Sequence, residues 1–234
     1  MAQIDLDISV PVDAFITYLC TQYDYTPATD AEGRVRTHTE VAYPDDIEAH
    51  ILRDTSWQIG CIYGPSGSGK TRLLHRFFGE ITLPRAPDDV ALVSAIGATF
   101  GYAPPDAIKL LTSVGLRSVH DLLKPSRVLS VGQRARFDTA AALASAHQSG
   151  KPCVIDEYTS TVNRSVAEGI SVGISRYIRR TPGLRFIACG CHRDVIPWLK
   201  PDWVLDLTFG EHPEDDLALT ERFPVDFPDY TEIK

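Results

Sequence analysis

The sequence lacks any apolar run long enough to cross a membrane as a helix. Such a helix needs about 20 consecutive apolar residues, and polar or charged residues interrupt every apolar stretch of this 234-residue chain much sooner. The first seven residues carry two aspartates, Asp5 and Asp7, where a secretory signal would carry basic residues before an apolar core. We therefore expect a soluble protein of the cytoplasm.

Cysteine is scarce, and its spacing excludes a disulfide framework. There are five cysteines, an odd number, and Cys20 stands apart from the other four, which lie in or beside apolar runs (Cys61, Cys153, Cys189 and Cys191). An odd set without paired spacing is typical of reduced thiols. The run Cys189-Gly-Cys191-His192 has the spacing of half a metal site, but the second half is missing. We expect cysteines of core strands.

The chain also lacks the broad basic surface of a general nucleic-acid binder. Its net charge is −8, and residues 211–234 hold eight acidic against two basic side chains, which leaves the rest of the chain at about −2. The only cluster of arginines is expected to be the solvated face and end of a helix: Arg176, Arg179, Arg180 and Arg185. We treat residues 211–234 as an acidic C-terminal tail.

Apolar strands alternate with amphipathic helices along most of the chain. Alternating polarity predicts a half-buried strand over Ile4–Val10, and residues 24–40 are typical of a loop or hairpin. Further strands are expected at 57–63, 90–96, from Pro152, 184–191 and 203–209, and helices after Lys70 and at 105–114, 133–147 and 163–180. The pattern predicts an α/β fold with a mostly parallel central sheet, without internal repeat or coiled coil.

A phosphate-binding loop follows the strand at 57–63. Its eight residues are Gly64, Pro65, Ser66, Gly67, Ser68, Gly69, Lys70 and Thr71. Glycines let successive N–H groups turn toward one anion, and the helix after the loop adds its positive N-terminal end. Lys70 can reach the β- and γ-phosphates of a nucleotide, and the Thr71 hydroxyl can bind Mg²⁺. The loop predicts nucleotide binding without separating kinase, GTPase and ATPase.

Two carboxylates end the apolar strand Cys153–Ile155. The carboxyl ends of parallel strands are where ligands bind in open α/β sheets. Asp156 is a candidate for holding Mg²⁺, and Glu157 for accepting a proton from an attacking water. Alone, the pair has an ordinary alternative as surface acids, but the phosphate loop before it favours the catalytic interpretation.

A second anion-binding turn, Leu129-Ser-Val-Gly-Gln133, precedes the helix at 133–147. A serine hydroxyl and a glycine N–H at a helix N-terminus can bind an anion. Because one triphosphate does not need two such turns in one chain, we expect Ser130, Gly132 and Gln133 to close over a nucleotide bound to another subunit. The alternative is an ordinary serine N-cap.

Together these motifs resemble the nucleotide-binding domain of the ABC ATPase superfamily, from about Tyr43 to about Trp203. The resemblance implies a P-loop NTPase with an N-terminal antiparallel β-subdomain and a short helical subdomain at about 86–135, all within one domain over 1–210. It implies a head-to-tail homodimer in which Ser130 and Gly132 contact the partner's γ-phosphate. ATP and Mg²⁺ would be bound, with Asp156 serving the metal and Glu157 acting as the base.

Three further assignments follow from the resemblance. The family's D-loop corresponds to Ser160-Thr-Val-Asn163, with asparagine where aspartate is usual. His192 stands 35 residues after Glu157, where the family places a histidine that senses the γ-phosphate. Tyr43 lies 21 residues before Gly64, where the family places an aromatic ring that stacks on adenine, although core packing is an equal alternative.

The departures from the family concern the segment between Thr71 and Leu129. It holds no glutamine, the residue that usually binds Mg²⁺ and links to a membrane partner, and at 57 residues it is shorter than in transporter subunits. The signature has Val131 in place of its first glycine. We therefore expect a non-transporter ATPase, with slow or partner-stimulated turnover, that switches a protein partner.

Some stretches, among them Asp156–Ser160, resemble small stand-alone ABC ATPases found beside GNAT-type acyltransferases, so such an enzyme is a candidate partner. Three alternatives stay open: the ATP subunit of a transporter, an ATP-gated clamp that barely turns over, and an ATPase of DNA modification or repair.

Overall fold

The computed structural model describes residues 2–43, 51 and 56–208 of the chain. The chain divides into two compact units, Met1–Ile47 and Glu48–Lys234. The expectation of a single domain over 1–210 thus covers two compact units, and the acidic tail at 211–234 lies outside the described residues. No helix among the described residues combines the length and apolar character of a membrane span.

The N-terminal unit is an antiparallel strand pair with a helix between the strands. β1 (Ala2–Val10) pairs with β2 (Val35–Tyr43), in a register that joins Ala2 to Tyr43 and Val10 to Val35. The connection contains α1 (Ala14–Gln22), which begins where the Asp13 side chain accepts a hydrogen bond from the N–H of Ile16. The expected strand at 4–10 and the antiparallel N-terminal sheet are confirmed. The helix was not expected, because none of its residues is buried and it shows no apolar stripe.

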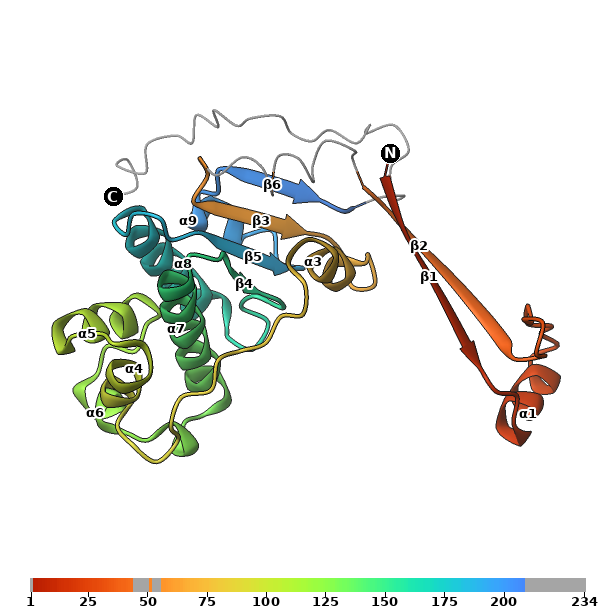
Figure 1. Cartoon of the computed structure of the whole chain (residues 1–234), viewed down its shortest axis with the longest axis horizontal. Helices are drawn as coiled ribbons and strands as arrows, with labels where there is room; N and C mark the ends of the chain where they lie inside the picture. The colour runs from red at the N-terminus through yellow and green to blue at the C-terminus, as the bar shows by residue number, and fades with distance from the viewer. Residues whose placement is uncertain (1, 44–50, 52–55, 209–234) are drawn as a thin grey trace. The chain divides into compact units, whose positions relative to one another are not determined.

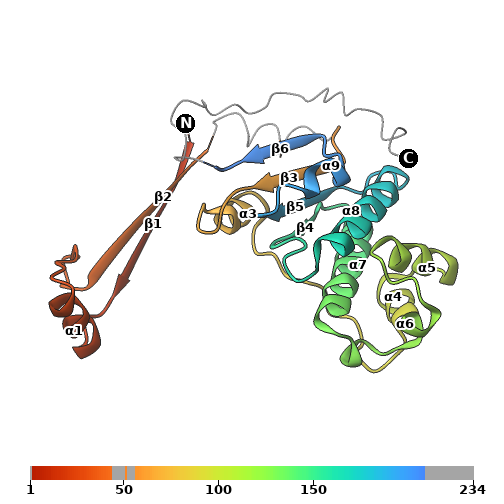
Figure 2. The same ribbon diagram turned by 180° about the vertical axis from the view of Figure 1, so that it is seen from behind.

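The larger unit is built on a four-stranded parallel sheet in the order β4-β5-β3-β6. The strands are β3 (Ile59–Tyr63), β4 (Cys153–Ile155), β5 (Phe186–Gly190) and β6 (Trp203–Asp206). Their residues are almost all buried, as expected for strands covered on both faces. The predicted α/β fold with a parallel central sheet is confirmed (Figures 1 and 2).

Helices follow the strands and fill the interval between them. α3 (Lys70–Phe78) follows β3, α8 (Arg164–Arg179) lies between β4 and β5, and α9 (Val195–Leu199) lies between β5 and β6. Between α3 and β4 lie α4 (Leu92–Phe100), α5 (Pro104–Ser113), α6 (Val119–Leu123), a 3₁₀ turn at Ser126–Val128 and α7 (Val131–Ser149). The expected reduced helical segment at 86–135 is therefore made of three short helices, a 3₁₀ turn and the start of α7.

The strand predicted at 90–96 is wrong, because this stretch belongs largely to α4. Leu92, Ala95, Ile96 and Phe100 are buried, whereas Ser94 is exposed. This is the i, i+3, i+4 spacing of a helix face, which a short apolar run does not reveal until its length is known. The segment packs on other helices and forms no ladder.

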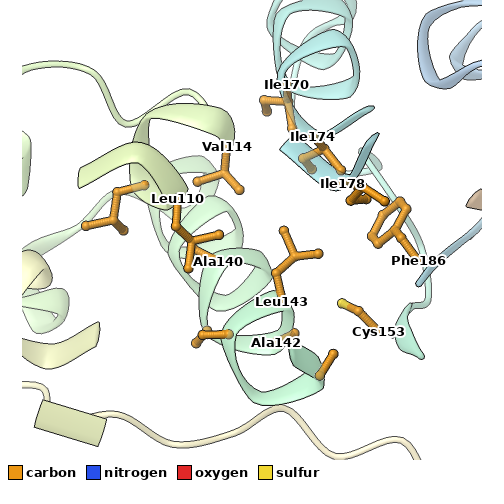
Figure 3. Packing of buried hydrophobic residues seen from close by; sticks show 14 of the residues in the cluster. Leu110, Val114, Ala140, Ala142, Leu143, Cys153, Ile170, Ile174, Ile178 and Phe186 are labelled. Carbon is orange, nitrogen blue, oxygen red and sulfur yellow. The ribbon is translucent and has the colours of Figure 1, made fainter. Parts of the chain in front are cut away.

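α7 is the central helix of the core. Its alanines at 140, 141 and 144 are buried and let neighbouring elements approach closely, while Leu143 is fully buried. Figure 3 shows Leu143 pointing from α7 toward Ile178 of α8 and Phe186 of β5. Burying a leucine of this kind contributes about 2 kcal/mol.

Candidate nucleotide site

The phosphate loop joins the buried strand β3 to α3. Gly67 and Gly69 have φ angles of 84° and 85°, a left-handed conformation that side-chain-bearing residues rarely adopt. The Lys70 side chain is 5% exposed, and its Nζ donates to the carbonyl oxygens of Gly64 at 2.9 Å and Pro65 at 2.7 Å. An ammonium group has three N–H donors, so one remains for an anion held by the loop.

The buried Ser68 hydroxyl oxygen has no hydrogen-bond partner among the described residues. An unsatisfied buried polar atom of this kind costs about 1–3 kcal/mol. The N–H groups of the first turn of α3 also have no partner within the helix. A phosphate group in the loop would satisfy such donors, so the residues present fit the group that the sequence predicts.

Thr71 and Asp156 meet although they are 85 positions apart. The Thr71 hydroxyl donates to Asp156 Oδ2 over 2.6 Å. A hydroxyl and a carboxylate oxygen are ligand types that Mg²⁺ prefers in proteins. The other carboxylate oxygen, Oδ1, accepts from the N–H of Glu157 at 2.9 Å, which fixes the orientation of the Asp156 side chain. The pair fits a magnesium ion beside the phosphates, and its role as a metal site stays a prediction.

Glu157 has an unusual backbone and an exposed side chain. Its φ angle is 51°, and that of Thr159 is 64°, conformations that cost a non-glycine residue about 1–2 kcal/mol. The turn is held by Ser160, whose N–H and hydroxyl both donate to the Glu157 carbonyl, at 3.0 and 2.8 Å. The buried Tyr158 anchors it on the other side through a hydroxyl contact of 3.0 Å with Ser171. The carboxylate is thus placed by a rigid turn and stays accessible to water.

β5 lies between the strand of the phosphate loop and the strand of the carboxylates. Its end contacts both: the carbonyl of Gly190 accepts from the N–H of Gly64 at 3.3 Å, and that of Cys189 accepts from the N–H of Tyr158 at 2.8 Å. His192 follows two residues after Gly190 and is half-buried. The topology therefore brings the ends of all three segments together, and His192 as a γ-phosphate sensor stays a prediction.

Burial decides the chemistry of the cysteines around this sheet. Cys61 is fully buried, which raises its pKa to about 12, and burial likewise raises the pKa of the Cys153 and Cys189 thiols. These three are core-strand cysteines, as expected. Cys191 is exposed, so the expectation of a core cysteine is wrong there: it follows the end of β5. No group of three metal-binding side chains occurs among the described residues.

The signature turn, Leu129–Gln133, is an N-cap closed on itself. The Ser130 hydroxyl accepts from the N–H of Gln133 at 3.3 Å, and the Gln133 side chain accepts from the N–H of Ser130 at 3.1 Å, a capping box. The N–H groups of Val131 and Gly132 have no partner in the described hydrogen bonds. In both views of the unit the start of α7 lies apart from the start of α3 (Figures 1 and 2). Within one chain, the signature turn and phosphate loop therefore do not share a site.

The signature turn packs against the turn after Glu157. A Cβ atom on Gly132 would lie 3.4 Å from Val162 Cγ1 and 3.7 Å from the Thr161 carbonyl. Asn163 caps α8 by accepting from the N–H of Val166 at 2.9 Å. Arg136 donates to the carbonyls of Gly132 at 3.1 Å and Gly115 at 3.4 Å. The turn after Glu157 and the signature turn therefore pack directly against each other.

A cavity of about 210 Å³ lies beside the carboxylates, lined by Asp156, Glu157 and the residues that follow them. Leu83 is the lining residue from the segment between α3 and α4. Arg136 also lines it. Sequence reasoning missed both: Leu83 carries no recognisable signal, whereas Arg136 lies one helical turn after Gly132.

Tyr43 ends β2 in the N-terminal unit, and its adenine-stacking role stays a prediction.

No protein-family model and no curated protein matches this chain. Among solved structures it is similar to the dimeric structure of MJ0796, a bacterial ABC transporter cassette, with 15% identity, a TM-score of 0.48, and coverage of 65% of this chain and 81% of that one. It is also similar to the ATP-binding cassette MJ0796 in a post-hydrolysis state bound to ADP and Pi, with 14% identity, a TM-score of 0.48, and coverage of 66% and 82%.

Proposed function

We propose that this protein is an ATPase of the ABC type whose two copies share each nucleotide site. The observation that carries the proposal is the hydrogen bond of 2.6 Å between the Thr71 hydroxyl and Asp156 beside the phosphate loop, where β5 lies between the strands β3 and β4 that lead to these residues. That arrangement brings a cation, a hydroxyl, two carboxylates and a histidine to one edge of the sheet. The substrates would be ATP and water, and the products ADP and phosphate.

Each residue of the site has a separate task in this proposal. The loop N–H groups and Lys70 hold the phosphates, and Lys70 offers its third donor to the oxygens where charge develops. Glu157 accepts a proton from the attacking water, which typically contributes about 10² to 10⁴ in rate. A bound magnesium ion would neutralise charge on the β- and γ-phosphates, held by Thr71 and Asp156. His192 would contact the γ-phosphate from the end of β5.

A second copy is proposed because, among the described residues, the signature turn faces no nucleotide-binding group of its own chain. Ser130 and Val131 are exposed, and the Ser130 hydroxyl, which already accepts a hydrogen bond, retains its own proton for donation. That proton and the N–H groups of Val131 and Gly132 make a three-donor turn at the positive end of α7. Placed over the γ-phosphate of a partner, it would complete a head-to-tail homodimer.

We further propose that the dimer switches a protein partner and is not a transporter subunit. The support is the segment between Thr71 and Leu129, which is short, lacks glutamine and places Leu83 beside the carboxylates. A GNAT-type acyltransferase is a candidate partner on the sequence resemblance alone. Purification of the Glu157→Gln form with bound ATP, followed by identification of bound proteins, tests this part separately.

The shared site is tested by gel filtration of Glu157→Gln with ATP and Mg²⁺. Slowing hydrolysis should trap the dimer, so the apparent mass should double from 25.8 kDa. Adding Ser130→Arg places bulk and positive charge in the signature turn and should restore the monomer. The matched control is Ser149→Arg at the other end of α7, which should leave the dimer intact.

Two outcomes would overturn parts of the proposal. A monomer in both Glu157→Gln and the Ser149→Arg control would rule out the shared site. An ATPase rate within twofold of the parent in Glu157→Gln would remove Glu157 as the base, whereas negligible turnover of the unmodified protein would favour an ATP-gated clamp.

A further inference from the structure

A second cavity lies toward the end of the parallel sheet opposite the phosphate loop. Its volume is about 1080 Å³, and it lies among the helices α4, α5, α7 and α8. The last turn of α8 leads into the amino end of β5, whereas the carboxylates follow the carboxyl end of β4. We call it the helical groove, and its polar and charged lining includes Tyr102, Lys109, Arg117, Gln148, Arg176 and Arg180.

Three arginines of the helical groove have no compensating charge. Arg117, Arg176 and Arg180 are exposed, and their guanidinium groups make no ion pair or hydrogen bond within the described part of the chain. By contrast, Arg179 on the same helix pairs with Asp202 at 2.8 Å, and Lys109 pairs with Asp106 at 2.9 Å. In a chain of net charge −8, this is a concentrated positive surface.

The floor of the groove is aromatic and apolar. The Tyr102 hydroxyl lies 2.9 Å from His147 Nδ1, and Tyr177 lines the groove with them. Burial raises the pKa of both phenols, so they stay neutral near pH 7. Ile108 from α5 lines the groove and is 44% exposed. A ligand that suits such a groove carries negative charges and apolar rings together.

We propose that the helical groove binds the chain's own acidic segment, residues 211–234. That segment carries a net charge of −6 and places Phe223, Phe227 and Tyr230 among its acids. Its carboxylates match the three free guanidinium groups, which recognise carboxylates well. Its rings match the apolar floor.

The length of the segment is sufficient. The 24 residues of 211–234 span up to about 80 Å when extended, whereas α8, which runs between the two ends of the sheet, is about 24 Å long. Attachment to the same chain also favours binding, because covalent linkage of a ligand to its site gives an effective concentration of the order of millimolar. A modest intrinsic affinity is therefore enough for intrachain binding.

Photo-crosslinking of the full chain tests this. Benzoylphenylalanine is introduced at Ile108 or Gln148, both of which line the groove and neither of which belongs to the nucleotide site. Irradiation should give an adduct to a peptide within 211–234, located by mass spectrometry. When unlabelled and ¹⁵N-labelled protein are mixed before irradiation, each adduct should join two peptides with the same isotopic label, because the crosslink forms within one chain. Salt at 0.5 M should lower the yield severalfold, because screening weakens exposed charge pairs.

Charge reversal supplies the decisive comparison. Arg176→Glu with Arg180→Glu should lower the adduct yield at least tenfold. The matched control, Arg85→Glu with Lys151→Glu, changes the net charge equally at exposed positions outside the groove and should leave the yield within twofold. The proposal is overturned by adducts outside 211–234, by mixed-label adducts, by no adduct at either position, or by equal yields in the two variants. None of these results depends on ATP hydrolysis.

Discussion

The phosphate loop and the signature turn are both turns at a helix N-terminus, yet they are completed differently. In the loop, two glycines adopt left-handed conformations, a buried lysine crosses back to the carbonyls of Gly64 and Pro65, and the Ser68 hydroxyl has no partner among the described residues. In the signature turn, Ser130 and Gln133 satisfy each other as a capping box.

This difference separates a turn that needs a ligand from one that does not. The phosphate loop keeps a positive charge and an unsatisfied hydroxyl in a buried place, and a bound anion would accept hydrogen bonds from both. The signature turn is a stable helix start without a ligand. Its two free N–H groups, those of Val131 and Gly132, remain available to an anion. The comparison predicts that removing the cation of the loop affects nucleotide chemistry, whereas removing the cap of the turn affects the stability of the free protein.

The largest expected effect is that of Lys70→Met. Removing the cation that faces the phosphates should lower ATP turnover about 100- to 1,000-fold. The free energy of unfolding should change by less than about 1 kcal/mol, because replacing a buried charge by an apolar side chain of similar volume is often neutral. The measurements are steady-state phosphate release and urea unfolding followed by circular dichroism.

Ser130→Ala is the counterpart in the signature turn. Loss of the N-cap should lower the free energy of unfolding by about 1 kcal/mol, an effect that requires no nucleotide. If Lys70→Met destabilises the free protein more than Ser130→Ala does, the distinction between the two turns is wrong.

A pair of glycine substitutions tests how tightly the backbone of each turn is packed, separately from its polar groups. A Cβ atom on Gly64 would lie 2.7 Å from Ser68 Oγ and 2.9 Å from Leu207 Cβ, whereas one on Gly132 would meet nothing closer than 3.4 Å. Gly64→Ala should therefore destabilise by about 1–3 kcal/mol through overpacking, and Gly132→Ala by less than about 1 kcal/mol. Thermal unfolding of both variants without nucleotide measures this, and equal shifts in Tm would contradict it.

The sequence was most informative where chemistry requires adjacent residues. The phosphate loop, the Asp156–Glu157 pair and the helix after Ser130 are local patterns, because each function depends on a few neighbouring positions. The strands at 57–63, 184–191 and 203–209 could also be located, since buried parallel strands are continuous apolar runs.

The sequence was least informative where packing decides. The run at 90–96 was predicted as a strand, and only its contacts with other helices show that Leu92, Ala95 and Ile96 share a helix face. The position of β5 between β3 and β4 is a property of the whole sheet, and no spacing along the chain encodes it. Leu83 reaches the carboxylates through a segment without regular structure. In the signature turn, the sequence offered a serine N-cap as one alternative, whereas the reciprocal hydrogen bond to the Gln133 side chain was not predicted.

The smallest expected effect is that of Gln133→Ala. This change removes the side chain that accepts from the N–H of Ser130 at 3.1 Å and donates to Asp121 Oδ1 at 3.0 Å. Half of the capping box is lost while the Ser130 hydroxyl remains, so the free energy of unfolding should fall by about 0.5–1 kcal/mol. The matched control is Gln148→Ala in the last turns of the same helix, where the exposed side chain makes no described hydrogen bond and the change should be near zero. Urea unfolding without nucleotide separates the two variants. If Gln133→Ala and Gln148→Ala had the same free energy of unfolding, the Gln133 side chain would not stabilise the signature turn. The turn would then resemble the phosphate loop, which needs a ligand.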